Sequence, residues 1–446
     1  MRDMNQSSGA HEGRPSSAFQ RFFHSEAAGS VLLLFFTGVA LSWANSPWAD
    51  LYDRMLHAPI GVSVGGWSFS MSAAHWVNDG LMAIFFFVVG LEIKREILVG
   101  QLSTIRSALL PVAAALGGLV APALIYASLN AGTPGARGWG VPMATDIAFA
   151  LGVLALVGPR VPVGLKVFLT ALAIADDLGA VLVIAIFYTE RVSLVALGTE
   201  AALVAALFLA IRLTSRWYAV YVVLAVGIWA AMLASGVHAT VAGILVAMAI
   251  PVRASIEPER FIDTVRGRVA YLEQGALTRD SMVRDRDQMA AIENVATATL
   301  DFLPAGFALE RYLHPITAFG ILPVFALFNA GVRLDGRLQE AVLHPVSLGV
   351  VLGLFFGKQV GITLTSWVAV RTGQAELPPG VTLGQLYGAS ILGGIGFTMS
   401  IFVASLAFPE GPLLAAAKLG ILVASAVSGV IGFTVLKLIL RRAPAT

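Results

Sequence analysis

The stretch VFLTALAIADDLGAVLVIAIFY, residues 167–188, is the part of the sequence that most clearly indicates the fold class. An uninterrupted apolar run of about 20 residues is long enough to cross a bilayer as a helix. Its only charged residues, Asp176 and Asp177, lie at its centre, where each carboxylate costs roughly 2.5 to 3.5 kcal/mol on insertion scales. Intramembrane acids usually mark a proton relay or a cation path. The stretch therefore predicts a membrane-spanning helix that carries a cation or proton site.

The composition places the whole chain in the membrane. Its 446 residues are 57% hydrophobic and 13% charged, and the mean hydropathy is +0.81. These values are too apolar for an ordinary soluble domain, so we predict an all-α, polytopic membrane protein. The net charge of +2 is dispersed among short loops, which argues against a nucleic-acid partner. The absence of cysteine excludes disulfides, thiol catalysis and thiolate metal sites.

Apolar runs separated by charged residues, glycine or proline predict about twelve spans. The expected spans are residues 27–45, 71–91, 107–129, 139–158, 163–188, 193–212, 217–233, 236–250, 312–331, 346–370, 384–407 and 413–436.

The Lys and Arg residues predict the orientation of these spans. Most of the 29 fall in segments that are cytoplasmic if the N-terminus is inside, as the positive-inside rule favours. We therefore expect both termini to be cytoplasmic, with a tail over residues 1–26 and another over 438–446. Spans one to eight then lie within 27–250 and spans nine to twelve within 312–437. A charged cytoplasmic loop with helical content joins them over 251–311.

A β-hairpin is predicted outside the membrane over about residues 59–70. Ile60, Val62 and Val64 alternate with small residues before Gly65-Gly66, and Trp67 and Phe69 alternate with serines after it. Two period-2 runs separated by Gly-Gly are typical of a hairpin with a primed turn. The alternative is an irregular loop.

Further polar residues are expected at membrane depth beside the acid pair. Thr145 and Asp146 follow Gly140 and Pro142 in the fourth span, and Lys358 lies near the middle of the tenth. Since an unpaired ammonium in hydrocarbon would be driven to deprotonate, we expect Lys358 to face a buried carboxylate, although a purely architectural ion pair is the alternative.

The adjacent acids cannot both face one partner squarely, because neighbouring helical residues point about 100° apart. One can pair with a cation on a neighbouring helix while the other borders the ion path. A sodium ion prefers oxygen ligands, as other hard cations do, and Asp176, Asp177 and Thr145 are the obvious suppliers.

Two other classes of protein also place acids in a membrane. An intramembrane aspartyl protease needs two aspartates that converge from separate helices, whereas these are neighbours and no Gly-X-Gly-Asp element accompanies them. A passive cation channel tolerates acids along its lining but gives no reason for the acid pair, the mid-span lysine and the glycine cluster Gly393, Gly394 and Gly396 together. Coupled transport accounts for all of them.

Five motifs carry a resemblance to a known family. They are Ala-Thr-Asp-Ile-Ala-Phe-Ala (144–150), Leu-Ala-Ile-Ala-Asp-Asp-Leu-Gly-Ala (172–180), Gly-Val-His-Ala-Thr-Val-Ala-Gly (236–243), Gly-Lys-Gln-Val-Gly (357–361) and Gly-Ile-Gly-Phe-Thr-Met-Ser-Ile-Phe (394–402). Together they resemble the NhaA-type bacterial sodium/proton antiporters, from about Arg21 to Leu436.

The resemblance implies an architecture and a transport site. Spans three to five and ten to twelve would form inverted-topology repeats, with broken helices four and eleven crossing at the midplane near Asp146 and Gly394. Asp176 and Asp177 would bind Na⁺, Li⁺ or protons, and Lys358 would pair with Asp176. Asp146 and Lys358 would offset the partial charges of the broken helix ends.

The resemblance also implies regulation, assembly and location. Glu92, Glu96, Glu310 and His314 match a cytoplasmic pH-sensing region, and His238 matches a residue linked to pH response. The protein would be an electrogenic, pH-regulated antiporter, not an enzyme, and would need no cofactor. It would reside as a multi-pass protein among the lipids of the bacterial inner membrane, as a homodimer joined through the hairpin.

Overall fold

The computed structural model describes residues 18–65, 67–189, 193–213, 218–253, 256–274, 285–333 and 338–442. Residues 1–17 of the predicted tail 1–26, residues 443–446 of the predicted tail 438–446, and the turn residue Gly66 lie outside these ranges.

The first half of the chain contains ten α-helices and one hairpin among the described residues. They are α1 (Ala18–Ala44), α2 (Ala49–His57), β1 (Pro59–Val64), β2 (Trp67–Ser72), α3 (Ala73–His75), the π-helical turn η1 (Trp76–Leu81), α4 (Met82–Leu98), α5 (Ile105–Asn130), the 3₁₀ segment η2 (Pro134–Met143), α6 (Ile147–Val157), α7 (Val163–Phe187), α8 (Leu194–Leu213), α9 (Tyr218–Ser235) and α10 (Thr240–Ala249).

The second half is helical throughout its described part. Its elements are α11 (Pro258–Gln274), α13 (Arg286–Phe302), α14 (Ala305–Ile316), the π-turn η3 (Thr317–Ile321), α15 (Leu322–Asn329), α16 (Leu338–Leu343), α17 (Pro345–Leu352), the π-turn η4 (Gly353–Gly357), α18 (Lys358–Arg371), α19 (Leu383–Leu392), α20 (Phe397–Ala407) and α21 (Pro412–Arg442).

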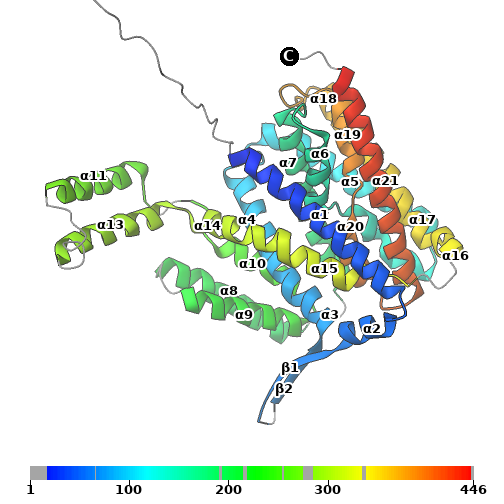
Figure 1. The fold of residues 1–446 in the computed structure, drawn as a ribbon, viewed down its shortest axis with the longest axis horizontal. Helices are drawn as coiled ribbons and strands as arrows, with labels where there is room; N and C mark the ends of the chain where they lie inside the picture. The colour runs from blue at the N-terminus through cyan, green and yellow to red at the C-terminus, as the bar shows by residue number, and fades with distance from the viewer. Residues whose placement is uncertain are drawn as a thin grey trace, which may run out of the picture.

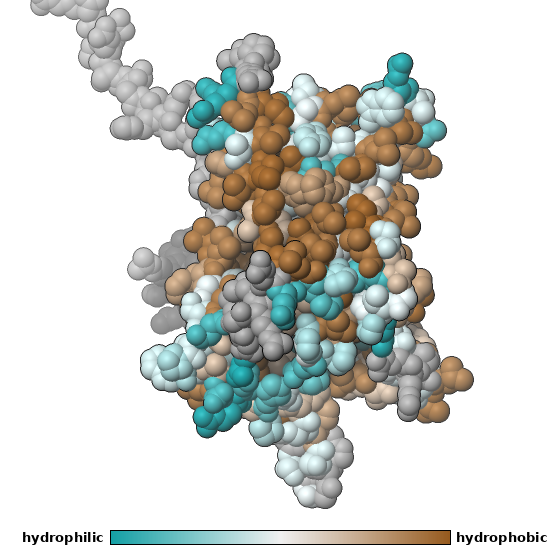
Figure 2. Space-filling view, turned by 90° about the vertical axis from the view of Figure 1, so that its right-hand side faces the viewer, coloured by the Kyte–Doolittle hydropathy of each residue, from teal (hydrophilic) through white to brown (hydrophobic). Residues whose placement is uncertain are grey.

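The helices form a bundle with the dimensions of a membrane protein. Six described helices, counted through their π-turns, are long and apolar enough to cross a bilayer, and three bent pairs raise that number to nine. Figure 2 shows a broad band of apolar surface on one face of the molecule, with hydrophilic residues gathered toward its ends. In Figure 1, α1 begins and α21 ends at the top of the bundle, while the hairpin projects from the bottom.

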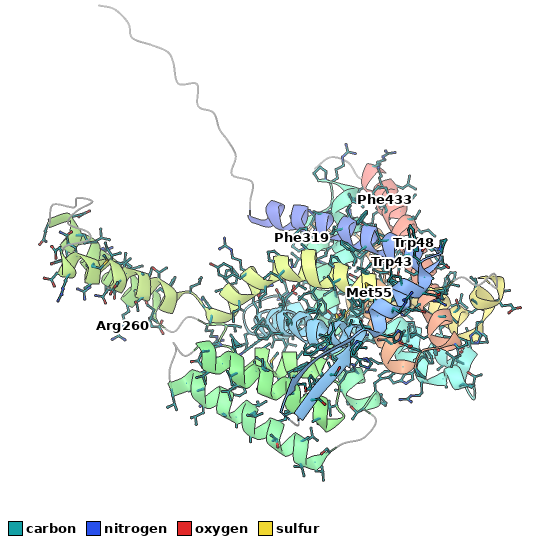
Figure 3. The ribbon with its side chains drawn as sticks, turned by 60° about the horizontal axis from the view of Figure 1, so that its bottom comes forward. Trp43, Trp48, Met55, Arg260, Phe319 and Phe433 are labelled. Carbon is teal, nitrogen blue, oxygen red and sulfur yellow. The ribbon has the colours of Figure 1, made fainter. Side chains whose placement is uncertain are left out.

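Several helix boundaries differ from those expected from hydropathy. Helix α1 begins at Ala18, so part of the expected N-terminal tail is helical, and α14 begins at Ala305 within the expected loop. Helix α2 was not predicted, because its Asp50, Asp53 and Arg54 interrupt the apolar pattern. It bends by 113° from α1, and Trp43, Trp48 and Met55 gather where the two helices meet (Figure 3).

The predicted β-hairpin is present. Strands β1 and β2 are antiparallel and pair Pro59 with Ser72 through to Val64 with Trp67. This register leaves two residues for the turn, and Gly65 there has φ +61°. Glycine populates this left-handed region without a steric penalty, which is why the Gly-Gly pair marks the turn.

The long loop between α10 and α14 contains a pair of packed helices, as its helical content suggested. Helices α11 and α13 lie side by side and project away from the bundle (Figure 1). Phe261 stacks on Phe302, with ring centroids 4.4 Å apart. The two ends of the loop are joined at the bundle, where Gly306 N in α14 donates a hydrogen bond to Pro251 O after α10 at 2.9 Å. Arg260 on α11 lies well away from the transmembrane helices (Figure 3).

The core of the bundle depends on one very close helix contact, between α5 and α18. A Cβ added at Gly361 would lie 2.0 Å from the carbonyl oxygen of Gly117, and one at Gly117 would lie 2.3 Å from that of Gly361. Small residues of this kind let membrane helices approach backbone to backbone. The contact is one helical turn from Lys358, so it sets the depth at which that side chain enters the core.

Candidate ion-binding site

Two helix breaks meet at the centre of the bundle. Residues 144–146 separate η2 from α6, with a bend of 45°, and residues 393–396 separate α19 from α20, with a bend of 48°. Backbone groups that lack a helical partner at one break form hydrogen bonds with residues of the other break. Asp146 N donates to Ile395 O at 2.7 Å, and the Thr145 hydroxyl donates to Gly393 O at 2.9 Å. Non-helical backbone at membrane depth requires such internal partners.

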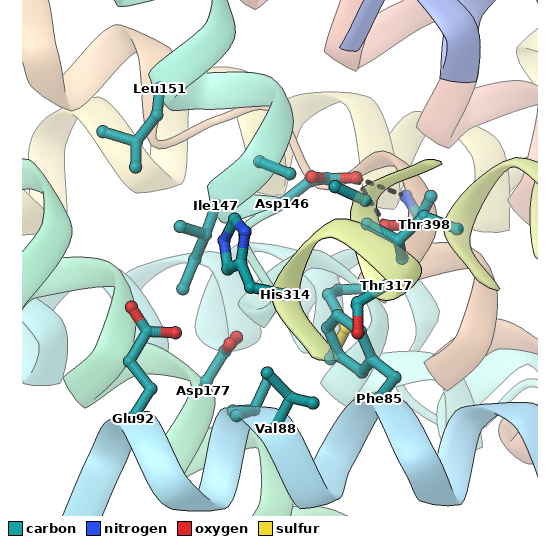
Figure 4. A pocket seen from close by; sticks show the side chains of 15 residues that line it. Phe85, Val88, Glu92, Asp146, Ile147, Leu151, Asp177, His314, Thr317 and Thr398 are labelled. Atoms are coloured by element: carbon teal, nitrogen blue, oxygen red, sulfur yellow. Dashed lines mark hydrogen bonds between the residues drawn. The ribbon is translucent and has the colours of Figure 1, made fainter. Parts of the chain in front are cut away.

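Asp146 lies at the N-termini of both short helices. Its Oδ1 accepts from Phe149 N at 2.9 Å and so caps α6. Its Oδ2 accepts from Thr398 N at 3.1 Å and from the Thr398 hydroxyl at 2.5 Å, at the start of α20 (Figure 4). A carboxylate is favoured beside the positive end of a helix dipole. Asp146 therefore holds the two breaks together and places negative charge where both helix N-termini point.

The two acids of α7 have different surroundings, although both are 1% exposed. Lys358 Nζ donates to Asp176 Oδ2 at 2.6 Å, and the lysine side chain is completely buried. Asp177 makes no such pair among the described residues, and its buried Oδ1 accepts no hydrogen bond there. Its carboxylate is within electrostatic range of Glu92, Asp146 and Lys358.

Asp177 borders a cavity of about 60 Å³, which has room for a few water molecules. Glu92 of α4, His314 of α14 and Asp146 in the break before α6 line the same cavity, and the Asp146 carboxylate is directed toward Thr398 (Figure 4). Thr317 and Thr398 contribute hydroxyl groups to its wall. Asp176 and Thr145 are not among its lining residues. The cavity wall thus holds two buried carboxylates, Asp146 and Asp177, together with Glu92 and hydroxyl oxygens, which are the ligand type that a hard cation prefers.

A cation in this cavity would not be held by a cluster of acids. Within the part of the chain that the structure describes, no three His, Asp or Glu residues gather as metal ligands. The available donors are a few carboxylate and hydroxyl oxygens, the ligand type that hard cations prefer.

Glu96 and Glu310 form a separate charged group near the end of α4. Arg95 contacts both, through Nε to Glu310 Oε2 at 3.1 Å and through Nη1 to Glu96 Oε1 at 3.4 Å. Glu96 Oε2 also accepts from Gln101 N at 2.7 Å. The nearby Lys94 Nζ donates to the carbonyls of Met248, at 2.7 Å, and Ile250 at the end of α10. The charged group therefore joins α4 to its neighbours.

His238 lies apart from these groups, in the turn between α9 and α10. Its Nδ1 is 3.7 Å from Asp79 Oδ1, and its ring is 5.3 Å from that of Phe402, centroid to centroid. Of the five residues assigned to pH response, the structure brings Glu92 and His314 to the cavity, Glu96 and Glu310 to Arg95, and His238 to Asp79.

Sequence reasoning gave no role to three residues that the structure brings into the site. Thr398 lies within the quoted glycine-rich motif, and its position shortly after Gly394 could have indicated it. Arg95 was counted only as a topology signal. Thr317 gave no signal, because the π-turn that begins with it changes the helical phase in a way that periodicity does not reveal.

This combination of crossed helix breaks and a lysine-paired intramembrane acid defines the class of protein as a secondary ion transporter. A family model described as Na+/H+ antiporter 1 matches residues 20–436. The chain belongs to that family.

Its relatives are similar over nearly their whole length. The chain is 48% identical to the Na(+)/H(+) antiporter NhaA of Oleidesulfovibrio alaskensis over 423 residues, 95% of this chain and 94% of the relative. It is also 48% identical to the NhaA protein of Koribacter versatilis over 94% of this chain and 91% of the relative. The NhaA protein of Sulfurimonas denitrificans is 44% identical over 96% of this chain and 97% of the relative.

Proposed function

We propose that this protein exchanges cytoplasmic Na⁺ or Li⁺ for external protons by alternating access, with Asp177 as the carboxylate that holds either cargo. The observation that carries the proposal is the difference between the two acids, since Asp176 is paired with Lys358 while Asp177 faces a small cavity. Family membership and the printed names of the relatives support the same chemistry.

The cavity gives a physical reason for exchange instead of simple conduction. A carboxylate this deeply buried is costly to leave charged and uncompensated, so it is expected to carry either a proton or a cation. The two occupants exclude each other because they neutralise the same charge. If the Lys358–Asp176 pair opens when the cation arrives, the Lys358 ammonium can release a proton in addition to the proton that leaves Asp177. Two protons would then be exchanged for one cation, which makes the exchange electrogenic.

The crossed breaks support an inverted repeat. One half runs from α5 through η2 and α6 to α7, and the other runs from α17 and α18 through α19 and α20 to α21. Each half contains a continuous apolar unit, a broken helix and a second long helix. We assign the twelve spans, with both termini cytoplasmic, to a multi-pass protein of the bacterial inner membrane.

Neither alternative class accounts for this site. An aspartyl protease needs two free carboxylates facing one peptide, but Asp176 and Asp177 share one helix and Asp176 is engaged by Lys358. A passive channel would conduct ions without obligatory protonation. The buried Lys358–Asp176 ion pair would have no role in such a channel.

We assign pH regulation to the charged groups on the cytoplasmic side. Protonation of Glu96 would remove the charge that contacts Arg95 and weaken the acceptor for Gln101 N, which loosens the end of α4. Because α4 also carries Glu92 to the cavity, transport is expected to be silent at acid pH and to rise toward alkaline pH. Glu96→Gln or His314→Ala should shift that onset, and an unchanged pH profile in both variants would remove the assignment.

The test of the proposed function is ΔpH dissipation in everted membrane vesicles after addition of Na⁺, Li⁺ or K⁺. The parent protein is expected to dissipate ΔpH with Na⁺ and Li⁺. Asp177→Asn keeps the size and one oxygen but removes the charge, so it should abolish the response while the protein still inserts. Robust exchange by the Asp177→Asn protein would refute the proposed site, and dissipation without any added cation would favour a proton leak.

A further inference from the structure

Thr317 is the cavity residue that sequence reasoning missed. It lines the cavity that contains Asp177 and is 6% exposed. It is the first residue of the π-turn η3, and π-turns within α-helices occur frequently at functional sites. In Figure 4 its hydroxyl lies beside Phe85, on the wall that also presents His314.

The proton of this hydroxyl already has an acceptor. Thr317 Oγ1 donates to Leu313 O at 3.1 Å, one turn earlier in α14. A hydroxyl has one proton and two lone pairs, so this bond turns the oxygen into an acceptor toward the cavity. The Thr398 hydroxyl is oriented in the same way, by donation to Asp146.

The backbone of Thr317 is held in place on both sides. Ala318, the next residue, packs against α1, where a Cβ added at Gly29 would lie 3.4 Å from the Ala318 Cβ. The Thr317 N–H caps α14 by bonding toward His314 O and Leu313 O. With the backbone held, the hydrogen bond to Leu313 O orients the Thr317 hydroxyl.

We propose that Thr317 is a cation-affinity residue, which supplies an oxygen ligand, directly or through one water, to the Na⁺ or Li⁺ bound at Asp177. This inference rests on the proposed function. A cavity of about 60 Å³ holds so few waters that a cation near Asp177 is at most about one water away from each wall. Hard cations take several oxygen ligands, more than Asp177 alone can provide, and both oxygens of Asp146 on the same wall already accept hydrogen bonds from Phe149 and Thr398.

The test compares Thr317→Val, which keeps the shape and removes the oxygen, with Thr317→Ser, which keeps the oxygen. At alkaline pH, Thr317→Val is expected to raise the apparent KM for Na⁺ roughly 3- to 10-fold with little change in maximal rate, the effect of losing one polar contact. Thr317→Ser should retain the parent KM. Direct Na⁺ binding to the purified protein by calorimetry should weaken by the same factor.

Thr37→Val is the matched control. Thr37 on α1 makes the same bond to the carbonyl one turn earlier, Leu33 O at 2.8 Å, and is 5% exposed, but it does not line the cavity. It should leave the KM unchanged. The inference is overturned if Thr317→Val has the parent KM, or if Thr317→Ser is as impaired as Thr317→Val, which would indicate packing of the methyl group. A parent protein without Na⁺-dependent exchange would instead refute the proposed function.

Discussion

Asp176 and Asp177 are chemically identical neighbours with opposite surroundings. Asp176 meets the ammonium of Lys358, whereas Asp177 meets a cavity and the fields of other acids. Removing one partner of a buried ion pair typically costs about 3–5 kcal/mol, because the remaining charge has lost its compensation. The cost of burying each charge is therefore offset in different ways, by an ammonium at Asp176 and, in the proposed function, by the exchanging cargo at Asp177.

Competition at Asp177 gives a prediction at this scale. If Na⁺ and protons occupy the carboxylate alternately, lowering the pH should weaken the apparent Na⁺ affinity by up to about tenfold per pH unit for each proton displaced. Na⁺ titrations of ΔpH dissipation at several pH values measure this dependence. An affinity that is independent of pH near neutrality would rule out a shared site.

Lys358→Ala is expected to weaken the protein without a simple loss of function. Removal of the ammonium leaves Asp176 buried and uncompensated, so the acid will favour its protonated form. We expect lower thermal stability and residual exchange with altered charge stoichiometry, measured as the membrane potential generated per Na⁺ in proteoliposomes. Unchanged stoichiometry would show that the pair is purely architectural.

At the scale of the elements, the site depends on helices that are interrupted or unusually close. Asp146 joins the two breaks through α6 and α20, and the glycine contact between α5 and α18 brings Lys358 to the depth of α7. The π-turn η4 directly precedes Lys358, and η3 begins at Thr317. Asp146, Lys358, Thr317 and Thr398 are thus positioned at or beside a local departure from a regular helix, whereas Asp176 and Asp177 lie within the continuous helix α7.

Gly361→Ala tests the close contact. The added Cβ would meet the backbone of Gly117, which cannot move without separating α5 from α18. We expect a loss of about 1–3 kcal/mol in stability and impaired exchange, because Lys358 would shift away from Asp176. Thermal unfolding in detergent and vesicle assays measure both effects.

Gly429→Ala on α21 is the control for this substitution, since its Cβ would meet only Ile395 Cδ1, at an ordinary 3.8 Å. If both alanine variants behave like the parent, the contact does not position the ion pair.

At the scale of the whole molecule, two appendages lie outside the transport core. The α11–α13 pair projects to the left of the bundle, next to the hydrogen bond between Gly306 N and Pro251 O, and the hairpin projects from the bottom (Figure 1). In the described residues the hairpin is a two-stranded sheet, so each strand has one edge without a strand partner. Such edges are ready templates for pairing with another chain.

Deletion of residues 61–69 tests the hairpin as the dimer contact. If β1 and β2 pair with those of a second copy, the deletion should give a monomer on crosslinking that still exchanges Na⁺ for protons, because the hairpin contributes nothing to the cavity. A dimer that persists after the deletion would assign the contact to another surface.

The sequence by itself determined the membrane class, the acid pair and the hairpin, because each is a local pattern. Apolar run length, two charges at a span centre and period-2 alternation around Gly-Gly need no knowledge of neighbours. The motifs also indicated the family, which the family model confirms. Exact span boundaries were less accessible, since α1 and α14 begin within polar sequence, and in α14 the contact of Glu310 with Arg95 depends on a distant segment.

The residue pattern left open which acid is paired and which faces the cavity, and only the family resemblance pointed to Asp176 as the partner of Lys358, a contact that the tertiary structure contains. Asp176 and Asp177 have the same local sequence environment, and their difference arises from Lys358, 182 positions away from Asp176. Thr317 and Thr398 likewise enter the site only because a π-turn and a helix break bring distant segments to one small cavity. A one-dimensional pattern records which residues are polar, but the cost of burying each charge depends on partners that folding alone brings together.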